Sequence, residues 1–180
     1  MTMTDEELTR WTKSWAGVYA VGQDTMLKPF HGARTLDRPA IFALIEWKFN
    51  SMPHRLANAK RGISKEREQV FIDVTKAACS CIDDGAALRI LTVLQGVGPA
   101  LGSALLMAMN PIRWTVLDVR ALKSIRVVGY ESVPRNAQDP KTWLPYLEAC
   151  RDVQARTDEP LRSVDRALFA ANGEAVPPTW

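Results

Sequence analysis

The feature that most constrains the fold is a glycine-rich turn between two apolar stretches, Leu94-Gln95-Gly96-Val97-Gly98-Pro99. Leu88 and Leu91 precede it at helical spacing, and helical spacing resumes after Pro99. Glycine accepts a positive φ and has no side chain, so the backbone can turn tightly and approach another surface closely. Proline suits the first turn of the second helix. The sequence therefore predicts two helices joined by a tight hairpin over about residues 84–109.

Helical periodicity dominates the rest of the chain, and the alternation typical of strands is nearly absent. Capping signals mark several helix starts: Thr4 with Glu7, Asp37 with Pro39 in the first turn, and Ser64. We expect helices over about 4–15, 37–49, 64–81, 118–127, 141–156 and 159–171, besides the hairpin pair. The segment 17–37, with at most one short helical piece, a short basic segment 53–62 and the stretch 129–140 are expected as non-helical connections.

Length and composition fit one soluble domain. The chain has 180 residues, enough for a substantial core, and no linker divides it. Hydrophobic residues make up 47% and charged residues 24%, which is typical of globular proteins. No apolar run is long enough to cross a membrane, and the acidic N-terminus lacks the apolar core of a secretory signal. We therefore expect an all-α, compact multi-helix single domain over 1–180, located in the cytoplasm.

Cysteine and histidine give no sign of a metal centre. The chain has three cysteines and two histidines. Cys79, Cys81 and Cys150 suit neither a disulfide framework nor a zinc knuckle, and His31 and His54 are too scattered for a ligand set. We expect free thiols and no structural metal, cluster or organic cofactor.

Basic charge gathers around the hairpin. The net charge is only +3, but between Leu88 and Arg126 the single acid is Asp118, against five Lys or Arg. Seven Lys or Arg face three acids between Lys48 and Lys76. This distribution suits a polyanion binder, although helix surfaces are commonly charged. The amides that begin the helix after Gly98 would face an anion, as at other helix N-termini.

The stretch from Leu94 to Leu106, followed by Trp114-Thr-Val-Leu-Asp-Val-Arg, resembles the helix-hairpin-helix superfamily of base-excision DNA glycosylases. In that family a Gly-Val-Gly hairpin, a helix and an apolar stretch precede a catalytic aspartate. The resemblance covers about 88–126 and implies that Asp118, at the end of the loop 111–118, is that aspartate. It also implies contacts of Gly96, Val97, Gly98 and Ala100 with double-stranded DNA.

Two departures from the family narrow the implied activity. Bifunctional members carry a lysine nucleophile where this chain has Ala100, and the four-cysteine loop of an iron–sulfur cluster is missing. Lys48 and Lys123 could replace that lysine, although solvated lysines are the favoured interpretation. The resemblance therefore implies a monofunctional enzyme without lyase activity.

Each candidate site residue also has a structural interpretation. A carboxylate at Asp118 would stabilise positive charge on the sugar, or it would only cap the following helix. Trp47, Trp114 and Glu46 could line a pocket for an extruded base, or Trp47 and Trp114 could be core residues and Glu46 a solvent-facing one. Arg120 and Lys123 are candidate phosphate contacts or ordinary surface charges.

The family also implies a monovalent cation, K⁺ or Na⁺, held at the hairpin by the backbone carbonyls of Thr92, Leu94 and Val97. Such an ion would bridge to a DNA phosphate and would be structural. The sequence thus predicts a monomeric, nucleoid-associated DNA glycosylase that hydrolyses the bond to a damaged, mispaired or modified base. A non-catalytic helix-hairpin-helix module that binds DNA, or a helical domain that does not bind it, are the alternatives.

Overall fold

The computed structural model describes residues 3–19 and 21–176, without the side chains of Val21 and Gln23. The described part of the chain is all-helical and has no strand, which confirms the predicted fold class. The elements follow in the order α1 (Asp5–Val18), the 3₁₀ segment η1 (Val21–Phe30), α2 (Arg38–Phe49), α3 (Pro53–Ile63), α4 (Glu68–Ser80), α5 (Asp84–Leu91), α6 (Pro99–Met109), α7 (Val119–Val127), the 3₁₀ turn η2 (Pro140–Thr142), α8 (Trp143–Thr157) and α9 (Leu161–Ala171).

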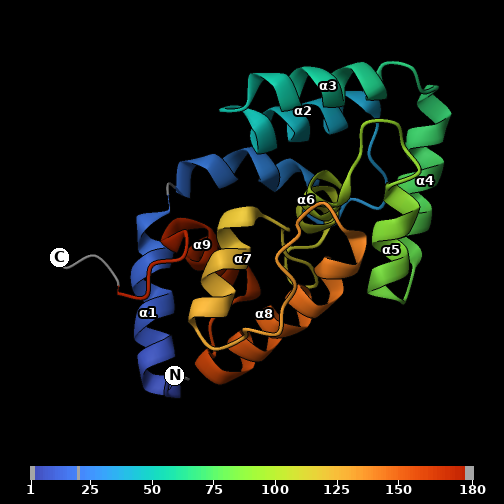
Figure 1. The fold of residues 1–180 in the computed structure, drawn as a ribbon. Helices are drawn as coiled ribbons and strands as arrows, with labels where there is room; N and C mark the ends of the chain where they lie inside the picture. Colours follow the sequence, from blue (N-terminus) through green and yellow to red (C-terminus); the bar gives the residue numbers. More distant parts are fainter. Residues whose placement is uncertain (1–2, 20, 177–180) are drawn as a thin grey trace.

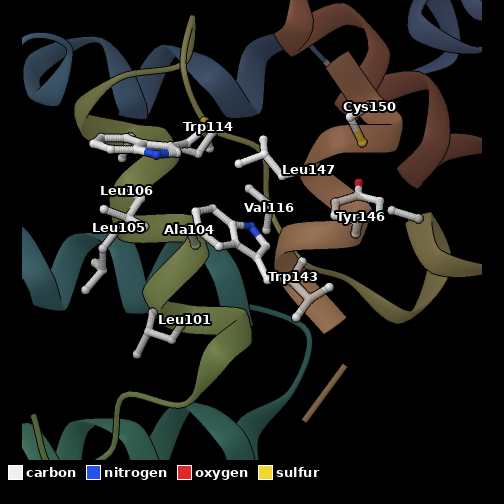
Figure 2. Packing of buried hydrophobic residues seen from close by; sticks show 14 of the residues in the cluster. Leu101, Ala104, Leu105, Leu106, Trp114, Val116, Trp143, Tyr146, Leu147 and Cys150 are labelled. Carbon is white, nitrogen blue, oxygen red and sulfur yellow. The ribbon is translucent and has the colours of Figure 1, made fainter. Parts of the chain in front are cut away.

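Helix α6 forms the centre of the molecule. Its residues from Leu101 to Met109 are all buried, as expected for a helix that is apolar on every side. On one side α1, α7, α8 and α9 pack on one another, and on the other α2, α4 and α5 contact α6 directly (Figure 1). The core cluster in Figure 2 joins residues of α6 and α8 with Trp114 and Val116 of the connecting loop. None of the helices in the described residues could cross a membrane.

The loop that leads to Asp118 is fixed by a partly buried carboxylate. Asp84 Oδ1 accepts hydrogen bonds from Arg113 Nε and Trp114 Nε1, both at 2.8 Å, and Asp84 Oδ2 pairs with Arg151 Nη1 at 2.9 Å. Trp114 itself is only 1% exposed. These contacts join α5, the loop and α8, so the segment that leads to α7 is anchored to two helices.

The glycine-rich turn forms a tight connection between α5 and α6. Gly96 has a φ of +86°, which only glycine adopts without strain. The Val97 amide donates to the Leu94 carbonyl at 3.0 Å, and the Val97 side chain is buried. A Cβ on Gly62 of α3 would lie 2.7 Å from the Gly96 Cα, so α3 and the turn touch through their backbones.

Most predicted helix starts are confirmed, and one is wrong. Thr4 with Glu7 forms a capping box, and the side chains of Asp37 and Asp118 cap α2 and α7. Ser64, predicted to start a helix, instead ends α3, and α4 begins at Glu68. The segment after Pro53 is a helix because proline at the first helical position does not interrupt it.

Candidate active site

Asp118 is held by contacts to both of its carboxylate oxygens. Oδ1 accepts a hydrogen bond from the Arg120 amide at 2.9 Å, in the manner of a helix cap. Oδ2 lies 2.8 Å from Lys48 Nζ. The side chains of Lys48 and Asp118 are 7% and 15% exposed, respectively. Asp118 is therefore a helix cap and one half of a largely buried ion pair.

This environment keeps Asp118 ionised. Burial alone raises the pKa of a carboxyl group, but the Lys48 ammonium and the Arg120 amide outweigh that effect and lower the pKa of Asp118 below its ordinary value of 3.8. At neutral pH the group is thus a fixed negative charge with a low affinity for protons.

Lys48 is not solvated, contrary to the favoured interpretation of the sequence. It follows Ile41 by seven residues and Ile45 by three, so it lies on the same inward stripe of α2. The stripe is apolar up to that point, and Lys48 continues it toward α7, where Asp118 neutralises the ammonium group.

A cleft with aromatic walls opens beside this ion pair. We call it the aromatic cleft; it has a volume of about 440 Å³ and is lined by Tyr19, Trp47, Lys48, Asn50, Ser51, Met52, Val116, Asp118, Arg120, Arg162, Asp165 and Phe169. Its residues come from α2, α7 and α9, from the segments that flank them, and from Tyr19 at the end of α1. Asp118 therefore lies on the wall of a site large enough for a small organic group.

A buried charge network supports the aromatic cleft. Arg162 pairs with Asp24 at 2.7 Å and with Asp165, and Arg166 pairs with Asp24 at 2.5 Å. Tyr19 donates its hydroxyl hydrogen to Asp24, and burial raises the pKa of Tyr19 to about 12. Burial also raises the pKa of Asp165. The network joins η1 to α9 and fixes Arg162 at the cleft.

A second depression connects the aromatic cleft to the hairpin. We call it the hairpin groove; one part, of about 440 Å³, shares Lys48, Met52, Asp118 and Arg120 with the aromatic cleft. The other part, of about 320 Å³, reaches Gly96 and Gly98, and the two parts share Phe49, Arg55, Ala100 and Gln138. Asp118 thus lies where the groove meets the cleft.

The hairpin end of the groove is open. No heavy atom lies within 4 Å of the position that a Cβ on Gly98 would take, and no side chain caps the start of α6. Arg55, Arg120 and Lys123 line the groove and are exposed. A cation at the carbonyls of Thr92, Leu94 and Val97 stays a prediction.

Of the three candidate pocket residues, only one lines the aromatic cleft. Trp47 lines the aromatic cleft. Glu46, its neighbour, faces away: its side chain is 54% exposed and pairs with Lys60 at 2.5 Å. Trp114 is buried beneath Arg113, whose guanidinium lies 4.5 Å from the ring centroid, and it does not line the cleft. The structural interpretations of Glu46 and Trp114 therefore match their positions.

Sequence reasoning missed eight residues of the cleft, namely Tyr19, Asn50, Ser51, Met52, Val116, Arg162, Asp165 and Phe169. Asp165 carried a signal, because it lies four residues after Leu161 and three before Leu168 on the buried stripe of α9. An aspartate in that position needs a partner. Tyr19 and Phe169 are brought together only by the packing of α1 on α9.

Comparisons of the chain with models of protein families, with curated proteins and with solved structures found no match. Among the described residues, no group of three or more His, Cys, Asp or Glu side chains is arranged to hold a metal ion.

Proposed function

We propose that the protein is a monofunctional DNA glycosylase that hydrolyses the N-glycosidic bond of a damaged, mispaired or modified base. The observation that carries this proposal is the position of Asp118. An ionised, largely buried carboxylate lies where an exposed, cation-lined groove meets a cleft with aromatic walls. A nucleotide extruded from a duplex needs that combination: a track for its backbone, a pocket for its base and a charge at the sugar between them.

The hairpin groove supports the binding part of the proposal. Exposed Arg55 and Lys123 line it, and the start of α6, which no side chain caps, lines its end with Gly98, Ala100 and Leu101. Cationic side chains and helix N-terminal amides together suit a phosphodiester backbone. The duplex would run along the groove, with the extruded base in the aromatic cleft.

Asp118 would act on the reacting sugar through its charge. As the bond between C1′ and the base nitrogen breaks, the base leaves with the bonding electrons and positive charge grows on the sugar. A fixed carboxylate stabilises that charge. Water then adds to C1′, and the proton that it loses passes to the departing base, which gives an abasic site and a free base. Because the pKa of Asp118 is lowered, its carboxylate is a poor base for removing a proton from water. We therefore favour an electrostatic role for Asp118 over general-base catalysis.

Lys48 supports the monofunctional form of the proposal. In its ion pair with Asp118 it is an ammonium group, which has no free electron pair for attack at C1′. The position after the hairpin is Ala100, and it lines the groove without a nucleophile. We therefore propose that strand cleavage is not part of the reaction. We also propose that the protein acts as a monomer on chromosomal DNA in the cytoplasm.

A panel of duplexes, each with one damaged, mispaired or modified base, tests the proposal. We expect strand cleavage only after alkali treatment, because an abasic site without lyase action needs base to break. Asp118→Asn should retain DNA binding and the helix cap, since asparagine caps well, but should lose base release. Asp73→Asn, an exposed change of the same kind on α4, is the matched control. DNA binding without release from any duplex by the unaltered protein would favour a non-catalytic DNA-binding module.

A further inference from the structure

An arginine side chain already lies over each of the three aromatic rings of the cleft. Arg162 lies 5.5 Å from the ring centroid of Tyr19 and 5.8 Å from that of Trp47. Arg120 lies 5.0 Å from the ring centroid of Phe169. A ring face attracts a cation through its quadrupole, and Tyr19 has a second guanidinium nearby, that of Arg166 at 5.8 Å. A second cation in the cleft would therefore share these rings with arginine and meet like charge.

The cleft also has hydrogen-bond donors to spare. A guanidinium has five N–H groups, and Arg162 uses four of them on Asp24, Asp165 and the Tyr19 hydroxyl. Lys48 has three N–H groups and uses one on Asp118. In the part of the chain that the structure describes, no acceptor is assigned to the remaining hydrogens.

The carboxylate oxygens of the cleft, in contrast, are engaged. Asp165 Oδ1 accepts from the Val116 amide at 3.3 Å and the Tyr146 hydroxyl at 3.4 Å, and its Oδ2 accepts from Arg162. Both oxygens of Asp118 accept hydrogen bonds from Lys48 and Arg120. A ligand that faces these carboxylates and the donors of Lys48 and Arg162 supplies acceptors. The other polar side chains without a charge at the cleft, Asn50 and Ser51, are exposed at its edge.

We infer that the aromatic cleft takes a neutral nucleobase rich in carbonyl oxygens and rejects positively charged alkylated bases. This inference rests on the proposed function and names its substrate class. Carbonyl oxygens would accept the spare hydrogens of Arg162 and Lys48, while the rings pack against the flat base. An alkylated base with a formal positive charge would meet the cations Lys48, Arg120 and Arg162 of the lining, which outnumber its two carboxylates, Asp118 and Asp165.

Two measurements test the inference. In the first, duplexes with uracil, hypoxanthine or 8-oxoguanine are compared with a 7-methylguanine duplex at mildly acidic pH, each rate being divided by the spontaneous rate. We expect acceleration only for one or more neutral bases. In the second, calorimetry compares guanosine with 7-methylguanosine, and we expect the charged nucleoside to bind about tenfold more weakly.

The outcomes separate the inference from the proposed function. Faster release of 7-methylguanine, or equal or tighter binding of 7-methylguanosine, overturns the inference and leaves the glycosylase proposal standing. No release from any duplex, together with no binding of either nucleoside, overturns both.

One variant tests the source of the selectivity. Arg120→Gln removes the exposed cation over Phe169 and should reduce the discrimination against 7-methylguanosine. Arg10→Gln on α1, a surface residue paired with Glu6, should leave the discrimination unchanged. Equal discrimination in both variants would show that Arg120 does not repel a charged base.

Discussion

Gly62 of α3 and Gly96 of the hairpin meet backbone to backbone. A Cβ on Gly62 would lie 2.7 Å from the Gly96 Cα, and a Cβ on Gly96 would lie 3.2 Å from the Gly62 Cα. Gly96 also has a φ of +86°. The hairpin is thus set against α3 by two residues without side chains. Because α3 also supplies Arg55 to the hairpin groove, this contact determines how the two walls of the groove lie.

We predict that Gly62→Ala destabilises the protein. The new methyl group would overlap the carbonyl group of Gln95, also at 2.7 Å, as well as the Gly96 Cα. Backbone atoms cannot move aside as a flexible side chain can, so we expect a loss of about 3 kcal/mol in the free energy of unfolding. Urea denaturation measures it.

Gly17→Ala is the matched control. Gly17 is exposed in α1, and no atom lies within 4 Å of its Cβ position. Alanine is the better helix former, so this variant should gain about 0.5–1 kcal/mol. Similar free energies of unfolding for the two variants would contradict the close approach of Gly62 to the hairpin.

Lys48→Gln should be far more costly than Lys60→Gln. The first change leaves Asp118 largely buried without its cation, which costs on the order of 3 kcal/mol. The second breaks the pair with Glu46, whose side chain is 54% exposed, and should cost less than about 1 kcal/mol. Thermal unfolding of both proteins gives the comparison, and equal losses would argue against a strong Lys48–Asp118 pair.

We predict that borohydride traps no covalent complex between the protein and a duplex that contains an abasic site. A Schiff base needs a neutral amine, and Lys48 is paired as an ammonium group. Gel electrophoresis under denaturing conditions would reveal an adduct. An adduct that disappears in Lys48→Gln would mean that the protein has a lyase step after all.

The stabilising effect of Asp118 should depend on pH only in acid. Its folded-state pKa is lowered, so its contribution is complete above the unfolded value and is lost as the pH falls through the folded value. The stability difference between the unaltered protein and Asp118→Asn should stay constant from about pH 5 to 8 and shrink below about pH 4. Urea denaturation at several pH values measures this difference. If this stability difference changed between pH 6 and 8, a titratable group other than Asp118 would be responsible.

Lys123→Gln should weaken DNA binding at every sequence. Lys123 is exposed on α7 and lines the hairpin groove. Loss of one phosphate contact should reduce the slope of log affinity against log salt by about 0.9. Lys76→Gln, an exposed site on α4 outside the groove, should leave that slope unchanged. Fluorescence anisotropy over a salt series gives both slopes.

The sequence predicted the helical fold and most helix starts, because caps and periodicity are local. The helix after Pro53 is not evident from the sequence, because proline inside a helical pattern usually ends a helix. At the first helical position, however, it has no hydrogen bond to lose. The Ser64 prediction was wrong as a result: because α3 forms before it, Ser64 ends that helix and does not begin the next one.

Prediction of the site was less complete. Asp118 and the hairpin could be picked out because each has a local signature. The position of Lys48 was readable in principle from its place after Ile41 and Ile45, but neighbouring Glu46 suggested a solvent face. The walls formed by Tyr19 and Phe169 could not be predicted, because they depend on how α1 packs against α9.

If the protein acts as proposed, the small exposed fraction of the Asp118 side chain would have a kinetic consequence. At 15% exposure, solvent in the empty cleft still reaches the carboxylate and weakens its field. A nucleotide that fills the cleft would displace that solvent and strengthen the attraction between the carboxylate and the sugar. A poorly fitting base would leave the solvent in place. Discrimination between bases would then take place during bond cleavage as well as during binding.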